Sequence, residues 1–163
     1  MTAPAVQTRA IPGSTNTYNK MLRNGYQSKI ACSLDPDISF WEKSITPPSM
    51  DNGEPIDITT MWNESYRTKA AQALSDSGMC TVRVAYDPDV YNQILAILAQ
   101  DAQWTVEFPD GSTLSFYGYL KSFEVGELVN GTQPEGTITI VVTNYDQTAG
   151  AEEPPVVVPT VGT

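Results

Sequence analysis

The sequence predicts a mainly β protein of the α+β class: an antiparallel β-sandwich with one flanking α-helix. Hydrophobic residues make up 40% of the 163 residues and charged residues 17%, so the chain can bury one core. Several segments alternate apolar and polar residues and are bounded by Gly, Pro, Asn and Asp, which is typical of strands. One segment, residues 88–100, has the apolar repeat of a helix instead. We expect a single domain over residues 28–146.

The first third of the chain is predicted to be mostly irregular. Residues 1–27 contain Pro and Gly without sustained periodicity, so we expect an extended N-terminal arm. Residues 28–34 form a first strand. Residues 35–55 are expected to be a long loop, and loops of about twenty residues inside a compact domain are usually functional or disordered. Phe40 and Trp41 favour function, because disordered segments seldom keep large aromatic residues.

The middle of the chain alternates between strand and helix signals. Residues 56–62 predict a strand, residues 65–78 a helical turn, and residues 80–87 a strand. The helix is expected from Pro88 to about Gln100, because Asp87 can cap it and Pro suits its first turn. Its predicted apolar stripe consists of Val90, Ile94, Leu95, Ile97 and Leu98.

The last third predicts a β-hairpin, a further strand and a tail. Residues 104–108 and 113–125 are strands joined by a turn at 109–112, and residues 137–145 form a half-buried strand. Aromatic residues at strand spacing here, such as Trp104 and Phe116, are expected to be cross-strand core pairs. Residues 147–163 are rich in Pro and are expected to be a flexible tail.

Residues 113–125 have apolar side chains on both faces. Strict alternation places one set on the core face and another on the opposite face. A strand of this length spans roughly 43 Å, so its shorter hairpin partner would leave half of it as a free edge. We therefore expect a second copy to cover the second face and to continue the sheet. The core-face set is Leu114, Phe116, Gly118 and Leu120; the second-face set is Tyr117, Tyr119, Lys121 and Phe123.

The charge of the chain argues against nucleic-acid binding. The net charge is −10, and the bases gather at the start: residues 1–50 hold five bases and three acids, whereas the remainder holds four bases and sixteen acids. A strongly acidic surface repels phosphate backbones. We expect the basic arm, through Arg9, Lys20 and Arg23, to dock on the acidic body of an adjacent copy.

The chemistry of common active sites is missing. The chain has no His, which removes histidine-based nucleophilic catalysis and His-ligated metals. Cys32 and Cys80 have no metal or redox spacing and are expected to be buried free thiols. We expect no enzyme activity, no cofactor and no metal. A glycosidase based on two carboxylates stays open as an alternative, although the close acidic pairs fit turns, a helix cap and the tail.

No apolar run is long enough to span a bilayer, and the N-terminal sequence lacks the apolar core of a signal peptide. We therefore expect the chain to stay in the cytoplasm where it is made, without membrane insertion of its own.

A monomeric carbohydrate-binding or adhesin β-sandwich is a further alternative, with Trp41, Trp62 or Trp104 as a binding platform.

Three motifs carry a family resemblance that covers residues 53–145. They are EPIDITTM (54–61), YDP (86–88) leading into the helix, and FPDGS (108–112) followed by a long strand that ends in SFEV (122–125). In this order they resemble the major tail tube protein of long-tailed, non-contractile bacteriophages.

The resemblance implies six copies closing into a ring with a continuous inner β-barrel, and rings stacked into a hollow tube. Such a tube conducts DNA without binding a sequence. The implied partners are further copies, a tape measure protein, a tail terminator and baseplate or tip proteins, in a virion assembled in the bacterial cytoplasm. The loop 35–55 is expected to contact the next ring. The inner tube of a contractile tail or a related secretion tube is the alternative. The interface candidates are Phe40, Trp41, Tyr117, Tyr119, Lys121, Phe123, Arg9, Lys20 and Arg23.

Overall fold

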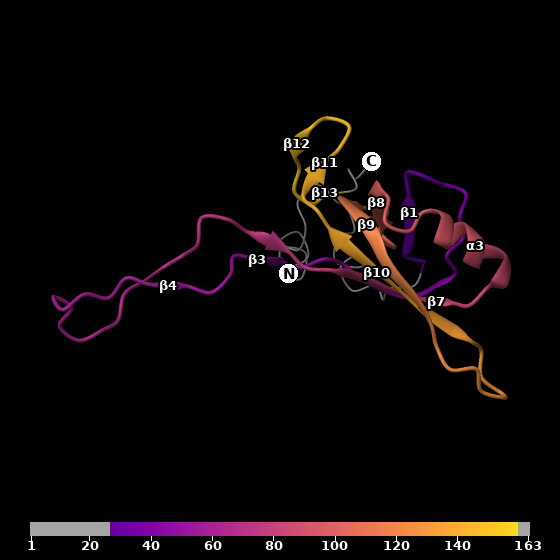
Figure 1. Ribbon diagram of the computed structural model, residues 1–163, viewed down its shortest axis with the longest axis horizontal. Helices are drawn as coiled ribbons and strands as arrows, with labels where there is room; N and C mark the ends of the chain where they lie inside the picture. The colour runs from indigo at the N-terminus through magenta and orange to yellow at the C-terminus, as the bar shows by residue number, and fades with distance from the viewer. Residues whose placement is uncertain (1–26, 160–163) are drawn as a thin grey trace, which may run out of the picture.

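One curled antiparallel sheet forms the body of the protein. The structure is a computed structural model, and it describes residues 27–159. Figure 1 shows the strands wrapped around a common interior with one helix beside them. In spatial order the strands are β1 (Lys29–Cys32), β8 (Asp101–Glu107), β9 (Thr113–Val125), β10 (Glu135–Val142), β7 (Cys80–Ala85) and β2 (Glu42–Thr46), and β13 (Val156–Val158) pairs with β9.

The core fills the inside of this curl. Inward-facing residues alternate along each long strand, as in the burial of Val82 and Val84 on β7. The two end strands approach each other, and the Ile30 backbone N–H donates to Glu42 Oε1 at 2.8 Å. The two layers of the predicted sandwich are thus opposite walls of one curled sheet, with the core between them. The predicted mainly β fold with one flanking helix is confirmed.

Helix α3 (Pro88–Ala96) begins where the sequence predicts. The Asp87 carboxylate accepts a hydrogen bond from the Asp89 N–H at 3.0 Å, which satisfies a free donor of the first turn. The helix ends four residues before the predicted Gln100, because Ala99 has a φ of +59° and its N–H donates to the Leu120 carbonyl on β9. Ile94 and Ile97 are buried, whereas Leu95 and Leu98 of the predicted apolar stripe are exposed.

The β8–β9 hairpin lies where the sequence predicts it, although β8 begins at Asp101 rather than at Trp104. The strand over 113–125 has the predicted bounds, and the Phe108–Ser112 turn is closed by a hydrogen bond from the Gly111 N–H to the Phe108 carbonyl. Trp104 faces Phe116 across the pair and both are buried. Cys32 and Cys80 are buried free thiols, as predicted.

Several sequence predictions about irregular regions are wrong. Residues 35–55 contain β2 and β3 (Met50–Asp51) rather than loop alone. The strand predicted over 56–62 is limited to β4 (Ile56–Asp57). The helical turn predicted over 65–78 is absent, since this segment holds β5 (Lys69–Ala70) and β6 (Asp76–Ser77). The region expected to be a tail contains β12 (Ala151–Glu152), paired with β11 (Tyr145–Asp146), and β13.

Residues 50–77 form a projecting hairpin, which is the most extended part of the described chain. β3 pairs with β6 near the body, and β4 pairs with β5 farther out. In Figure 1 the hairpin runs to the left, away from the sheet and from helix α3. Apart from Ser77 at its base, its side chains are not buried against any other part of residues 27–159.

Candidate assembly interfaces

The outer face of β9 carries the predicted second set of side chains up to Lys121. Leu114, Phe116, Gly118 and Leu120 all face the core and are buried. On the opposite face Tyr117 and Tyr119 are half-buried and Lys121 is exposed. The neighbouring outer positions are mainly hydroxyl-bearing, including Thr137 and Thr139 on β10 and Thr81 on β7. This face is accordingly more polar than the sequence suggested.

Phe123 lies on the core side of β9 rather than on the second face. The β9–β10 register shifts between Thr139 and Ile140, and one residue of β9 is left without a direct partner. Such a bulge reverses the alternation beyond it. Phe123 is thus opposite the buried Ile138, and its ring centroid is 5.6 Å from that of Tyr91 on helix α3. Its assignment to the second face was wrong.

The predicted free edge of β9 exists in part. β10 pairs with one edge from Gly118 to Val125, while β8 pairs with the other only as far as Tyr119. The Ala99 N–H then donates to the Leu120 carbonyl at 3.0 Å. Beyond this point no strand within residues 27–159 pairs with that edge. Residues 121–125 therefore offer backbone donors and acceptors to another strand.

Phe40 and Trp41 have different positions although they are adjacent. Phe40 is buried, with its ring centroid 6.2 Å from that of Trp104 in the core. Trp41 has a φ of +52°, which turns its side chain outward, and it is 58% exposed. Its Nε1–H donates to Asp87 Oδ2 at 3.1 Å. Of these two predicted interface residues, only Trp41 has an exposed side chain.

A three-residue ion-pair cluster connects β2, β7 and β10 on the outer face. Glu135 Oε1 lies 2.8 Å from Lys43 Nζ, and Glu135 Oε2 lies 2.6 Å from Arg83 Nη2. The hydrogen bond from Lys43, together with the two positive charges, holds the pKa of Glu135 below its ordinary value. The basic side chains of this face are thus partly neutralised within the chain.

Tyr117 is linked to the β11–β12 hairpin. Partial desolvation and a hydrogen bond with the Asp146 carboxylate raise the pKa of the Tyr117 hydroxyl. A cleft of about 360 Å³ lies beside this pair, between β8 and the β11–β12 hairpin. One of the predicted interface residues thus lies beside this hairpin.

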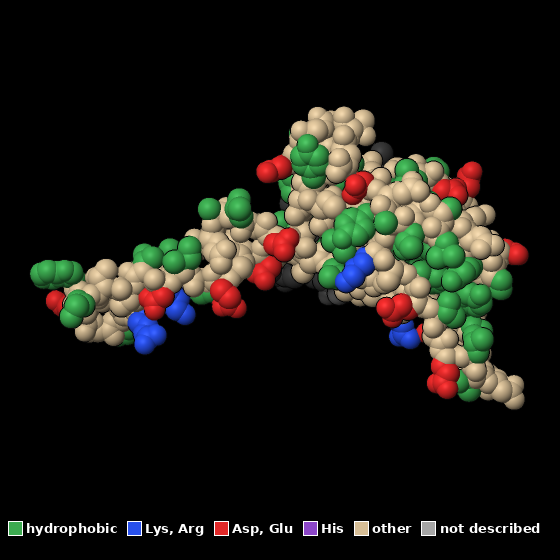
Figure 2. Space-filling view, viewed as in Figure 1, with side chains coloured by type: hydrophobic (Ala, Val, Ile, Leu, Met, Phe, Trp, Pro, Cys, Tyr) green, Lys and Arg blue, Asp and Glu red, His purple; other side chains and the backbone are tan. Residues whose placement is uncertain are grey.

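The projecting hairpin exposes the largest apolar side chains, and the sequence analysis did not identify it. Met61 is 102% exposed, Trp62 93% and Tyr66 86%; we call these three residues the hairpin tip. Figure 2 shows apolar side chains at the far end of the projection, well separated from the body. Exposed apolar patches of this kind are typical of surfaces that bind another molecule.

The base of the hairpin is fixed to the body. Ser77 is buried, and its hydroxyl donates to Asn144 Oδ1 at 2.7 Å and lies 3.0 Å from Met50 Sδ. The Gly78 N–H donates to the Ser49 carbonyl at 2.7 Å. A Cβ at Gly78 would lie 2.5 Å from the Ser49 hydroxyl, so a larger residue here requires the Ser49 side chain to move. These contacts direct the hairpin away from the sheet.

The remaining predicted interface residues, Arg9, Lys20 and Arg23, lie outside the described residues. Within residues 27–159 no group of three or more acidic or Cys side chains is placed to hold a metal. In the same range no helix has the length and apolar character to cross a membrane.

Proteins of similar fold occur in a baseplate, a virion and a sheath–tube complex. No protein-family model and no curated protein matches the chain. Among solved structures, a chain of the anti-feeding prophage baseplate, symmetrised sixfold, has a TM-score of 0.58 and 11% identity over 81% of this chain and 91% of that one. A chain of a native gene transfer agent virion has a TM-score of 0.57 and 16% identity over 74% and 94%.

A third likeness is to a chain of the PVC extracellular contractile injection system, in its extended sheath–tube complex. The TM-score is 0.57 with 14% identity, covering 90% of this chain and 100% of that one. The chain has a tail-tube-like fold. At these identities the likeness concerns fold alone, and it covers nearly the whole length of each similar chain.

Proposed function

We propose that the chain is a structural, non-enzymatic subunit of a phage-type tail tube. Six copies form a ring, and rings stack into a hollow tube. The observation that carries the proposal is the projecting hairpin, whose tip has Met61 and Trp62 almost fully exposed on a rigidly attached extension. The tail-tube-like fold supports the same conclusion. A fold with this much exposed apolar surface needs identical partners to cover it.

Ring formation would use the open edges of the sheet. Among residues 27–159, no strand pairs with one side of residues 121–125 of β9, and β1 and β2 end the sheet without a full ladder between them. Closing a ring of copies edge to edge removes such free edges, which otherwise invite uncontrolled pairing. The outer face with Tyr119 and Lys121 would then line the channel, because the opposite face is filled by the core and helix α3.

The charges fit a channel for DNA in transit. Arg9, Lys20 and Arg23 are the only charged residues outside the described range, so residues 27–159 carry a net charge of −13 against −10 for the whole chain. On the outer face, Arg83 and Lys43 are paired with Glu135. Apart from the exposed Lys121, which has no ion pair within residues 27–159, this wall consists mainly of hydroxyl groups and neutralised bases. Such a wall offers few attachment points for phosphates, so DNA can slide through.

The proposed partners are those of a tail: further copies, a tape measure protein inside the tube, a terminator at one end and a baseplate or tip at the other. We assign the chain to a non-contractile, long-tailed phage assembled in the bacterial cytoplasm. The likeness to a chain of an extended sheath–tube complex favours a second candidate, the inner tube of a contractile system. Electron micrographs of the native particle distinguish the two by the presence of a sheath.

The rival functions have less support. Trp104 is 1% exposed, so it cannot form part of a carbohydrate-binding platform. The close acidic pairs have backbone roles: Asp87 caps helix α3, and Asp35 Oδ1 accepts from the Asp37 N–H at 3.3 Å. Neither pair is thereby arranged as the two opposed carboxylates of a glycosidase.

Negative-stain electron microscopy of the concentrated, purified chain tests the proposed function. Hollow rods or sixfold rings are expected. A matched variant that lacks residues 1–27 tests the role of the basic arm: its assembly should be weaker and less sensitive to salt. Particles of monomer size at all concentrations contradict the proposal, and unchanged assembly of the shortened chain contradicts the role of the arm.

A further inference from the structure

The hairpin tip is an ordered structure without a core beneath it. Asn63 organises the tip: its Oδ1 accepts from the Thr60 N–H at 2.9 Å, and its Nδ2 donates to the Tyr66 carbonyl at 3.1 Å and to Thr68 Oγ1 at 2.7 Å. Trp62 is thus presented on a turn that hydrogen bonds already hold in shape. A preorganised ligand loses less entropy on binding.

A groove of about 400 Å³ lies at the other end of the molecule, between the two end strands of the sheet; we call it the β1–β2 groove. Its floor is apolar, with Ile38 and Phe40 buried, and one wall is the exposed ring of Trp41. This size is typical of sites that enclose a small organic group. Its lining also includes Lys29, Ile30, Ala31, Pro36, Ser39, Glu42, Thr105 and Glu107.

The charges of the two surfaces are complementary. In the groove lining Glu107 is paired with Lys29 at 3.2 Å, and Glu42 accepts from the Ile30 N–H at 2.8 Å. Asp35 and Asp37, which flank Pro36 of the lining, add two further negative charges. Next to the tip, Lys69 has no ion pair within the described part of the chain, and Arg67 reaches only Asp57, at 4.0 Å. An acidic rim around an apolar floor matches an apolar tip followed by two basic residues.

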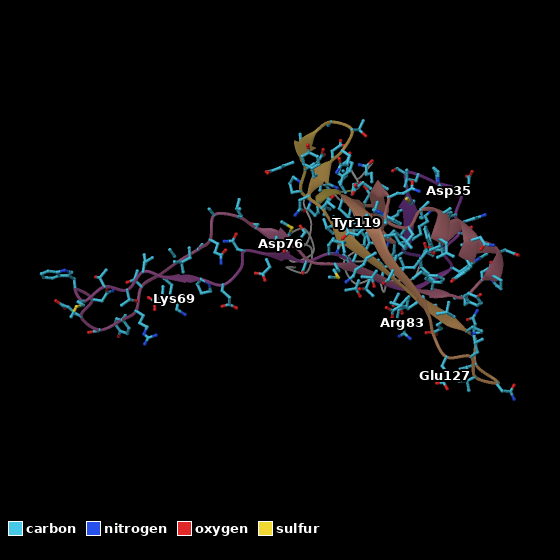
Figure 3. All side chains as sticks on the ribbon, viewed as in Figure 1. Asp35, Lys69, Asp76, Arg83, Tyr119 and Glu127 are labelled. Atoms are coloured by element: carbon cyan, nitrogen blue, oxygen red, sulfur yellow. The ribbon has the colours of Figure 1, made fainter. Side chains whose placement is uncertain are left out.

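The two surfaces cannot meet within one copy. Figure 3 places Lys69 partway along the projecting hairpin and Asp35 on the opposite side of the body. A protruding apolar group on one end and a pocket on the other make a head-to-tail contact, which repeats without closing and yields a filament.

From the exposed tip, the groove and their opposite positions, we infer that the β1–β2 groove is the receptor for the hairpin tip of a second copy of this chain. Trp62 and Met61 enter the groove beside Trp41, and Arg67 and Lys69 lie against the acidic rim. The inference rests on the proposed function, since it names the two surfaces that join successive rings.

Disulfide trapping in assembled protein tests this pairing. The native thiols do not interfere, because Cys32 is 1% exposed and Cys80 is 0% exposed. A variant with Met61→Cys and Ser39→Cys places one thiol on the tip and one in the groove. After assembly under reducing conditions and mild oxidation, it should give a ladder of covalent multimers on a non-reducing gel.

A matched control variant combines Met61→Cys with Thr148→Cys, which lies in the cleft between β8 and the β11–β12 hairpin. Little cross-linking is expected from it. Cross-linking of the control variant alone overturns the assignment of the receptor. Assembled tubes in which neither variant forms multimers also overturn it, while the proposed function survives. A chain that never assembles contradicts both.

A second measurement avoids any change in the groove. A photoreactive benzoylphenylalanine replaces Tyr66, which is 86% exposed, and the assembled protein is irradiated. Mass spectrometry should locate the adducts in residues 36–42 of another copy. Adducts confined to other segments contradict the inference, even if a double-Cys variant fails to fold.

Discussion

The substitution Trp62→Ala separates folding from assembly. Trp62 is 93% exposed in the single copy, so its removal should change the free energy of unfolding by no more than about 0.5 kcal/mol. In an interface a Trp side chain covers about 150–250 Å², which corresponds to roughly 4–6 kcal/mol at about 25 cal/mol per Å². Association entropy reduces this value, and about 2–4 kcal/mol is typical of a central interface residue.

A loss of about 2–4 kcal/mol raises the concentration needed for assembly by roughly 30- to 1000-fold. Sedimentation of a concentration series measures this shift, and urea unfolding below the assembly concentration measures the stability of the single copy. The expected result is a normal unfolding transition with assembly displaced to much higher concentration.

The matched control is Trp104→Ala, which changes the same residue type in the core. Trp104 is 1% exposed and its Nε1–H donates to the Gly118 carbonyl at 3.2 Å. This variant should lose about 3–5 kcal/mol of folding stability. If Trp62→Ala destabilises the single copy by more than about 1 kcal/mol, or assembles at the wild-type concentration, the reasoning about the hairpin tip is refuted.

Three further predictions concern the body. Gly118→Ala should lower the free energy of unfolding by about 1–3 kcal/mol or more in a urea titration, because the new Cβ would lie 2.3 Å from the Val141 carbonyl oxygen; wild-type stability would contradict the close approach. The folded-state pKa of Glu135 is lowered, first by its hydrogen bond from Lys43, so its contribution to stability is present at neutral pH and is lost as the pH falls through that value. Glu135→Gln should therefore be slightly less stable than wild type at pH 7, and the difference should disappear in acid; a difference that grows in acid would contradict this. Burial raises the pKa of Cys80 to about 12, so a thiol reagent at pH 8 should label it only after unfolding, and rapid labelling of the native chain would contradict its burial.

The sequence was most informative where one local rule decides the structure. Alternation alone placed Leu114, Phe116 and Leu120 in the core and gave both ends of β9. The Asp87–Pro88 pair fixed the start of helix α3, because capping depends on neighbouring residues only. The end of the helix depends on a hydrogen bond between Ala99 and β9, which no local pattern records.

The candidate site was predictable only in part, since it depends on distant contacts. A bulge opposite Thr139 moves the Phe123 side chain to the core face of β9. The alternating pattern of the sequence does not show where such a bulge occurs. Phe40 and Trp41 look alike in sequence, but the positive φ of Trp41 separates them. Residues 56–62 alternate like a half-buried strand, yet no element in the described part of the chain covers them, so only the structure reveals the projecting hairpin.

Sedimentation velocity of the purified full-length chain over a wide concentration range tests the central claim most directly. The claim is that one copy leaves apolar surface and sheet edges that only identical copies can cover. The account predicts a steep change from single copies to large, ring-based assemblies as concentration rises. A single compact species of constant size at every concentration would contradict it.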